Sequence, residues 1–168
     1  MTQPILYLML GYPGAGKTTV AKIISELTGA VHLWADKIRH EKYPNPTHSH
    51  AENLELYEYL NALTAEFLAS GQSVIFDTGF NFYKDRQLLR SIAAKHHAST
   101  CVLWLQTNNS TSRSRATQAG RNSYPNAMSL AQFERLSNCL EPPRPDEHAI
   151  NLDGTKISRQ YVKVTLNL

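Results

Sequence analysis

The chain has 168 residues and a formal net charge of +3 at pH 7, a length that suits one domain with a full hydrophobic core. The charge is too small to indicate nucleic-acid binding by itself. No apolar run is long enough to span a membrane, and the N-terminus lacks the pattern of a signal peptide. We therefore expect a cytoplasmic protein with a single domain over residues 1–168.

The first predicted element is a buried strand that leads into a phosphate-binding loop. Residues 5–10 are all apolar, and residues 11–18 read Gly-Tyr-Pro-Gly-Ala-Gly-Lys-Thr. This is a complete Gly-x-x-x-x-Gly-Lys-Thr loop, whose glycines let successive N–H groups point at phosphate oxygens. Apolar residues at helical spacing follow it. The loop therefore ends at a helix N-terminus, where the helix dipole favours phosphate.

This loop predicts the binding of ATP together with Mg²⁺. Lys17 reaches the β- and γ-phosphates, and the hydroxyl of Thr18 is placed to hold Mg²⁺. The spacing of the glycines excludes a dinucleotide-binding loop. The ATP-binding residues predicted in this segment are Gly14, Ala15, Gly16, Lys17, Thr18 and Thr19.

Four further apolar runs alternate with helical patterns, at residues 31–34, 74–76, 101–105 and 149–152. Gly71 is expected to end a long helix before the third strand, and Ser129 to cap a later helix that runs through Cys139. This alternation predicts an α/β fold, with a mostly parallel sheet and helices on both faces. The tail from Thr155 to Leu168 is ambiguous, although its last eight residues alternate like an edge strand.

Ligands of such a sheet bind outside the carboxyl ends of its strands, so the residues after each run are the candidates for chemistry. Asp36 follows the second run, where a carboxylate can accept the proton of an attacking hydroxyl. Arg39, one helical turn on, could hold an anionic part of the acceptor. The alternative for Asp36 is that it caps the short helix that follows.

The third run ends in Asp77 and Thr78. An Asp after a buried strand is the usual second half of a phosphate-loop site and binds Mg²⁺ directly or through water, although it could instead form a turn. The aromatic segment that starts at Phe80 can stack on a base or sugar, or it can anchor the next helix. We assign Asp77, Thr78 and Phe80, with Arg39, to the acceptor site.

An arginine-rich segment follows the fourth run and is expected to form a lid over about residues 108–128. A mobile arginine can neutralise the charge that develops during phosphoryl transfer, and we assign this role to Arg121. Arg113 and Arg115 would point about 200° apart on a helix, so they should serve different purposes. We place both in the ATP site, although the segment could also be a solvated basic helix.

The chain resembles the phosphate-loop kinases related to the 5′-kinase domain of phage polynucleotide kinase, a group often described as AAA-type predicted kinases. Zeta toxins and chloramphenicol phosphotransferases are more distantly similar. The matching segments are the phosphate loop, Ala-Asp-Lys-Ile-Arg, Val-Ile-Phe-Asp-Thr, the arginine-rich segment and Glu-Pro-Pro at 141–143. The resemblance implies a parallel sheet of order 2-3-1-4-5, Asp36 as the base, Arg39 as an acceptor contact and Arg121 as the lid arginine. Ala35 and Gly79 depart from the pattern of the polynucleotide kinases, and both departures touch the acceptor side.

Together these features predict an ATP-dependent kinase in which Lys17, Asp36 and Arg121 are catalytic. The favoured acceptor is a nucleotide or the 5′-OH of a nucleic acid, contacted over a few terminal nucleotides. A small-molecule kinase is the alternative, with a sugar nucleotide, a metabolite or an antibiotic as acceptor. An ATP-hydrolysing switch or a binding module without an acceptor is the alternative of another class. The sequence leaves the oligomeric state open.

Overall fold

The protein is built on a five-stranded parallel sheet with the strand order β2-β3-β1-β4-β5. The computed structural model describes residues 3–79, 82–118 and 128–168. The strands are β1 (Ile5–Leu10), β2 (Val31–Trp34), β3 (Val74–Asp77), β4 (Ser99–Gln106) and β5 (Ile150–Asp153). The predicted α/β fold, its five strands and its strand order are confirmed.

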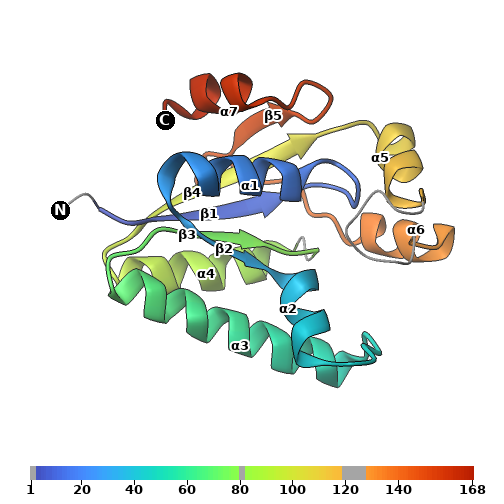
Figure 1. The fold of residues 1–168 in the computed structure, drawn as a ribbon, viewed down its shortest axis with the longest axis horizontal. Coiled ribbons are helices and arrows are strands. Elements are labelled where there is room, and N and C mark those ends of the chain that lie inside the picture. Colours follow the sequence, from blue (N-terminus) through green and yellow to red (C-terminus); the bar gives the residue numbers. More distant parts are fainter. Residues whose placement is uncertain (1–2, 80–81, 119–127) are drawn as a thin grey trace.

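Two layers of helices cover the sheet (Figure 1). On one face lie α1 (Lys17–Thr28) and α7 (Arg159–Leu166), and on the other lie α3 (His50–Ala69) and α4 (Tyr83–Lys95). The other helices are α2 (Ala35–Lys42), α5 (Asn109–Ala116), α6 (Leu130–Asn138) and the 3-10 helix η1 (Pro145–Glu147). Figure 1 shows α2, α5 and α6 towards the carboxyl ends of the strands, the edge where the candidate site residues lie.

The central strand β1 is buried on both faces, which explains its unbroken apolar run. Leu6 and Leu8 pack into the core beside α3 and α4, whereas Tyr7 and Met9 pack into the core beside α1 and α7. Two separate cores therefore hold the same strand, one on each side. This fixes the position of the phosphate loop that follows it.

The C-terminal tail forms the helix α7, so the alternation that resembled an edge strand was misleading. Val162 is fully buried, whereas Val164 is 67% exposed, so the apolar residues that count are four apart, at Val162 and Leu166. These two pack against the core beside α1. Ser158 caps the helix by accepting a hydrogen bond from the backbone N–H of Tyr161. Helical spacing and alternation share positions over so short a segment, and packing against α1 decides between them.

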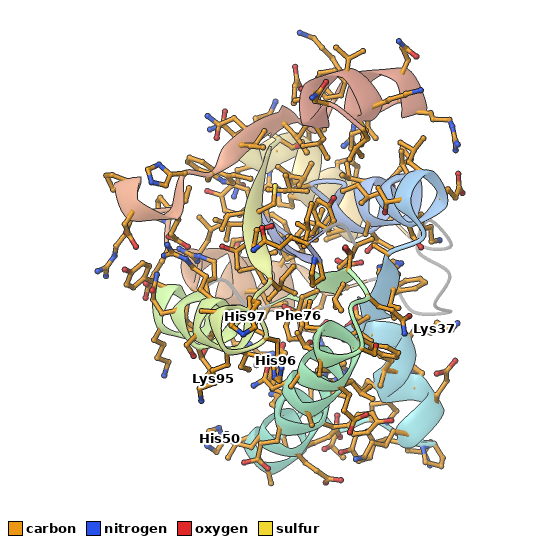
Figure 2. The ribbon with its side chains drawn as sticks, turned by 90° about the vertical axis from the view of Figure 1, so that its left-hand side faces the viewer. Lys37, His50, Phe76, Lys95, His96 and His97 are labelled. Atoms are coloured by element: carbon orange, nitrogen blue, oxygen red, sulfur yellow. The ribbon has the colours of Figure 1, made fainter. Side chains whose placement is uncertain are left out.

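The predicted helix ends are confirmed. Gly71 follows α3 with a φ of 80°, and Ser129 caps α6 in a capping box with Gln132. Figure 2 shows Lys95, His96 and His97 together where α4 ends, and Phe76 inside the molecule. In the part of the chain that the structure describes, no helix is both long and apolar enough to cross a membrane.

Candidate active site

The phosphate loop is shaped by glycines whose backbone other residues rarely adopt. Gly14 has a φ of 78° and Gly16 a φ of 109°, and a side chain on Gly14 would collide with the carbonyl of Ser112 in α5. A side chain on Gly16 would collide with Ile157, in the turn after β5. The loop is therefore held between α5 and this turn, with its backbone close to both.

Lys17 lies at the first position of α1 and folds over the loop that precedes it. Its Nζ donates hydrogen bonds to the carbonyls of Gly11 at 2.8 Å and Tyr12 at 2.9 Å. Desolvation lowers the pKa of Lys17, and the carboxylates of Asp77 and Asp36 oppose that shift. The ammonium group thus lies within the field of both predicted acids, where it can pair with phosphate.

Asp36 lies in the first turn of α2, directly after β2. Asp36 is exposed to solvent, so a ligand can reach it. The protein atoms around the carboxylate nevertheless desolvate it and raise its pKa, and the charge of Asp77 raises the pKa further. The N-cap of α2 is Trp34, and no side chain caps this helix. The alternative role of Asp36 as a helix cap is therefore excluded.

Asp77 ends β3 and is only 3% exposed. Its Oδ2 lies 3.0 Å from Nε2 of His32, on the neighbouring strand β2. The ring of His32 in turn stacks nearly parallel to Trp34, with ring centroids 6.0 Å apart. Thr78 is also buried, at 5% exposure. Asp77 is thus a fixed, buried carboxylate next to the phosphate loop and not part of an exposed turn.

The donor set fits Mg²⁺ that arrives with a nucleotide. The hydroxyl of Thr18 and the carboxylate of Asp77 are hard oxygen donors, which Mg²⁺ prefers. The described residues contain no group of three or more His, Cys, Asp or Glu side chains that could hold a metal ion. Phosphate oxygens and water would therefore have to supply the other ligands, as is usual for Mg²⁺ in phosphoryl-transfer sites.

The arginines of the predicted lid lie in different environments. Arg115 in α5 donates a hydrogen bond from Nη1 to the carbonyl of Gly154 at 2.9 Å, in the turn that also touches the phosphate loop. Arg113 is exposed on the same helix, so the prediction that the two serve different purposes is consistent with their positions. Arg121 and Phe80 lie outside the described residues.

Arg39 is close to Asp36 but is already bound. It is 4% exposed, its Nη1 forms an ion pair with Glu52 of α3, and its Nη2 donates to Asn53 at 2.7 Å. Its positive charge lowers the pKa of Asp36 against the larger effect of desolvation. The structure thus brings Arg39 into the field of the predicted base, but in a buried pair with a carboxylate.

One family model matches the part of the chain that contains the phosphate loop and both acids. Residues 6–143 match the family model described as an AAA domain. The chain belongs to this AAA domain family. No curated protein sequence matches the chain.

Solved structures with the same fold as this AAA domain include several kinases. A sugar kinase from Janibacter sp. is 19% identical with a TM-score of 0.72, over 99% of this chain and 94% of that one. The Mycobacterium tuberculosis APS kinase CysC, in complex with AMPPNP and APS, is 18% identical with a TM-score of 0.71, over 100% of both chains. A chain of the Pnkp1/Rnl/Hen1 RNA repair complex is 17% identical with a TM-score of 0.70, over 83% of this chain and 45% of that one.

Aromatic side chains near the site of this AAA domain do not all face an acceptor. The ring of Tyr83 lies 3.7 Å from the guanidinium of Arg144, and its hydroxyl donates to Asp146 at 3.1 Å. Tyr83 therefore anchors α4 to η1, which is the alternative that the sequence left open. A pocket of about 280 Å³ at the carboxyl end of β4 instead includes Tyr12 and Trp104, which sequence analysis did not single out.

Sequence analysis also missed His32 and Glu52, the partners of two predicted site residues. His32 is 45 residues from Asp77 in sequence, and Glu52 is 13 residues from Arg39. Neither spacing belongs to a motif. One signal was available for His32. The pairing of β2 with β3 brings residues of the two strands side by side, and a polar residue within an apolar run needs a partner where it is buried.

Proposed function

We propose that this AAA domain is an ATP-dependent kinase that transfers the γ-phosphate of ATP to a hydroxyl group. The observation that carries the proposal is the position of Asp36, an exposed carboxylate with a raised pKa within the electrostatic field of Lys17 and Asp77. A carboxylate whose pKa is raised is a stronger base, and one that remains exposed can receive a proton from an acceptor. A domain that only bound ATP would not need a base at this position.

In the proposed reaction, Asp36 takes the proton of the acceptor hydroxyl while the hydroxyl oxygen bonds to the γ-phosphorus. The bond between the γ-phosphorus and the β,γ-bridging oxygen breaks, and ADP leaves with the bond electrons. Backbone N–H groups of residues 14–19 and the ammonium of Lys17 hold the phosphates. Mg²⁺, when bound with ATP by Thr18 and Asp77, would neutralise phosphate charge. We also propose that Arg121 stabilises the transition state and that Arg113 and Arg115 belong to the ATP site.

The acceptor preferred from the sequence was a nucleotide or a nucleic-acid 5′-OH, with Arg39 as a contact for an anionic part of it. Because Arg39 is paired with Glu52, we place the small-molecule alcohol first and the nucleic-acid 5′-OH second. Both choices use the same base and the same phosphate loop. A cytoplasmic location and a lid over residues 108–128 remain predictions.

An acceptor screen with γ-labelled ATP tests the proposal. The panel should contain sugars and polyols, nucleosides, 3′-phosphorylated nucleosides, sugar nucleotides and short 5′-OH oligonucleotides. We expect label in at least one alcohol, and loss of that label in Asp36→Asn. Release of the label to water alone, equally in the wild type and in Asp36→Asn, would replace the kinase by an ATP-hydrolysing module.

A further inference from the structure

A group of residues with a buried ion pair at its centre joins α2 to the start of α3 beside the proposed base. We call it the α2–α3 clamp, and it consists of Arg39, Thr47, His48, Glu52 and Asn53. Arg39 and Glu52 form its centre, with side chains 5% and 7% exposed. Glu52 also accepts hydrogen bonds from the backbone N–H of Thr47 at 2.6 Å and from its hydroxyl at 2.8 Å. The clamp is thus a connected network and not an isolated ion pair.

The clamp leaves little of Arg39 accessible to a ligand, since its side chain is 5% exposed. Its two terminal nitrogens are bound to Glu52 and Asn53, and its Nε is buried without a partner among the described residues. Recognition of a phosphate by arginine normally uses two parallel N–H donors that face the ligand. Because the guanidinium is buried and paired with Glu52, a phosphate would have to enter the clamp and compete with that carboxylate for Arg39.

The two lysines of α2 also have carboxylate partners, although in more exposed positions than Arg39. Lys37 pairs with Glu41 at 3.7 Å, and Figure 2 shows Lys37 at the side of this helix. Lys42 pairs with Glu55 of α3 at 2.9 Å. Every lysine and arginine of α2 therefore has a carboxylate partner. Asp36 and Asp77 add two more carboxylates on this side, so an anionic group on the acceptor would have to compete with a carboxylate for each lysine and arginine of α2.

We propose that Glu52 is the residue that sets the charge specificity of the acceptor site. By holding Arg39 in the clamp, it makes the site select an uncharged alcohol, such as a sugar or polyol, over an acceptor that carries a phosphate near Arg39. Arg39 is then a positioning residue that fixes α2, and with it Asp36, against α3. This inference rests on the proposed kinase function, since it names the class of acceptor for the same site.

Calorimetric titration with inorganic phosphate tests this inference without any need for turnover. The phosphate loop is first saturated with a non-hydrolysable ATP analogue and Mg²⁺, so that the added phosphate can report only on the acceptor side. The variants are Glu52→Gln, which removes the carboxylate charge from Arg39, and Glu55→Gln as the matched control. Glu55 lies one turn away on the same helix and pairs with the surface residue Lys42, so the control loses the same charge without opening the clamp.

We expect no saturable phosphate binding to the wild type or to Glu55→Gln. We expect saturable binding to Glu52→Gln, with a Kd at least about tenfold below the weakest binding that the titration can detect. The binding gained should disappear in the double variant Arg39→Gln with Glu52→Gln. Label transfer should follow the same order, with Glu52→Gln gaining activity on a 3′-phosphorylated nucleoside relative to the unphosphorylated nucleoside. A retained thermal shift with the ATP analogue shows that each variant is folded.

Two results would overturn the inference. Phosphate binding to the wild type that Arg39→Gln removes would show that Arg39 is an anion receptor despite Glu52, and this measurement needs no variant of Glu52. Absence of phosphate binding in a folded Glu52→Gln would show that Glu52 is not the determinant. If Glu52→Gln does not fold, Glu52→Asp takes its place, since its shorter carboxylate withdraws from Arg39. Failure of the kinase proposal is separate, because it appears as an acceptor screen without label.

Discussion

The two sides of the candidate site are made in different ways. On the nucleotide side, the backbone gives the site its shape. Gly14 and Gly16 adopt positive φ angles and lie against α5 and the turn after β5. On the proposed acceptor side, pairs of side chains give the site its shape. These pairs are Asp77 with His32 and Arg39 with Glu52. The phosphate loop suits any nucleotide that carries phosphates. The side-chain pairs can be changed by one substitution, so the specificity for the acceptor can be altered there.

The difference also separates two kinds of energetic cost. A loop that is shaped by glycines has an entropic cost, because glycine loses more conformational freedom on folding than other residues do. A buried ion pair costs desolvation of both charges, and the attraction repays it only while both partners are present. Variants on the nucleotide side should therefore affect transfer first, whereas several on the acceptor side should affect stability as well.

The largest expected effect is that of Lys17→Ala on transfer. The substitution removes the ammonium that we propose pairs with the β- and γ-phosphates, so both ATP binding and transition-state stabilisation should be lost. We expect kcat/KM to fall by about 10⁴-fold or more, measured with the best acceptor of the screen, and the thermal shift by ATP to shrink.

Lys22→Ala is the matched control for this variant. Lys22 lies on the same helix, exposed to solvent, with its Nζ 4.9 Å from the ring centroid of Trp34. Its removal should leave transfer close to that of the wild type. Normal turnover by Lys17→Ala would show that the phosphate loop is not the site of transfer.

Asp36→Asn should be next in size. The amide cannot accept the proton of the hydroxyl, so transfer should fall by about 10²–10⁴-fold. ATP affinity should stay nearly the same, because we propose that the carboxylate acts on the acceptor. The melting temperature should not fall, since Asp36 caps no helix and its desolvated carboxylate works against stability. Asp85→Asn, in the first turn of α4, is the control that removes a carboxylate at a similar helix position.

The pH dependence of transfer gives a further test of Asp36. Its pKa is raised above the ordinary value of 3.8, and only the carboxylate form is a base. Activity should therefore rise with pH through an acid limb whose midpoint lies above 3.8, and the residual activity of Asp36→Asn should lack this limb. A limb that persists in Asp36→Asn belongs to another group.

The same raised pKa works against stability, because deprotonation of Asp36 as the pH rises through its folded pKa favours the unfolded chain.

Much of this molecule could be predicted from its sequence, because the signals are local or periodic. The phosphate loop occupies eight consecutive residues, and the apolar runs identify the five strands. The position of Asp36 after β2 follows from the same rule that places ligands at the carboxyl ends of strands. The tail was ambiguous because eight residues fit both an alternating and a helical pattern, and contact with α1 decides the outcome.

The partners of the acceptor side could not be predicted in the same way. Nothing in the spacing of Arg39 and Glu52 distinguishes a buried pair from two exposed charges, since the contact depends on how α2 turns against α3. The sequence correctly predicts that Asp77 lies at the carboxyl end of β3, but its hydrogen bond with His32 depends on the pairing of β2 with β3. Side-chain pairs between elements follow from tertiary packing, which no local pattern encodes.

The third prediction concerns the stability of the α2–α3 clamp. Arg39→Met leaves the buried carboxylate of Glu52 without its charged partner, so unfolding should become easier by about 3–5 kcal/mol, measured by urea denaturation. Lys42→Met, which breaks the more exposed pair with Glu55, should change stability far less. Equal losses in the two variants would show that the clamp is no more than a surface ion pair.

Acid should weaken the same clamp. Desolvation alone would raise the pKa of Glu52, but hydrogen bonds from Thr47 and Arg39 outweigh it and bring the pKa to about 2 from 4.5. Because the folded pKa is depressed, the stabilisation is present above pH 4.5 and is lost as the pH falls towards about 2. Chemical denaturation over this range should show an acid-dependent loss in the wild type that is smaller in Glu52→Gln.

The smallest expected effects compare two glycines with similar backbone angles. Gly14 has a φ of 78° and Gly29 a φ of 74°, so alanine at either position carries the cost of a left-handed backbone, about 1–2 kcal/mol. Nothing lies within 4 Å of a side chain at Gly29, whereas one at Gly14 would collide with the carbonyl of Ser112. The free energy of unfolding should therefore fall by about 1–3 kcal/mol more in Gly14→Ala than in Gly29→Ala. Only Gly14→Ala should weaken the binding of ATP, because its phosphate loop must move away from α5. Calorimetric unfolding and ATP titration of the two variants measure both differences. Equal losses of stability with unchanged ATP affinity would mean that the close packing of α5 on the phosphate loop does not shape the nucleotide site.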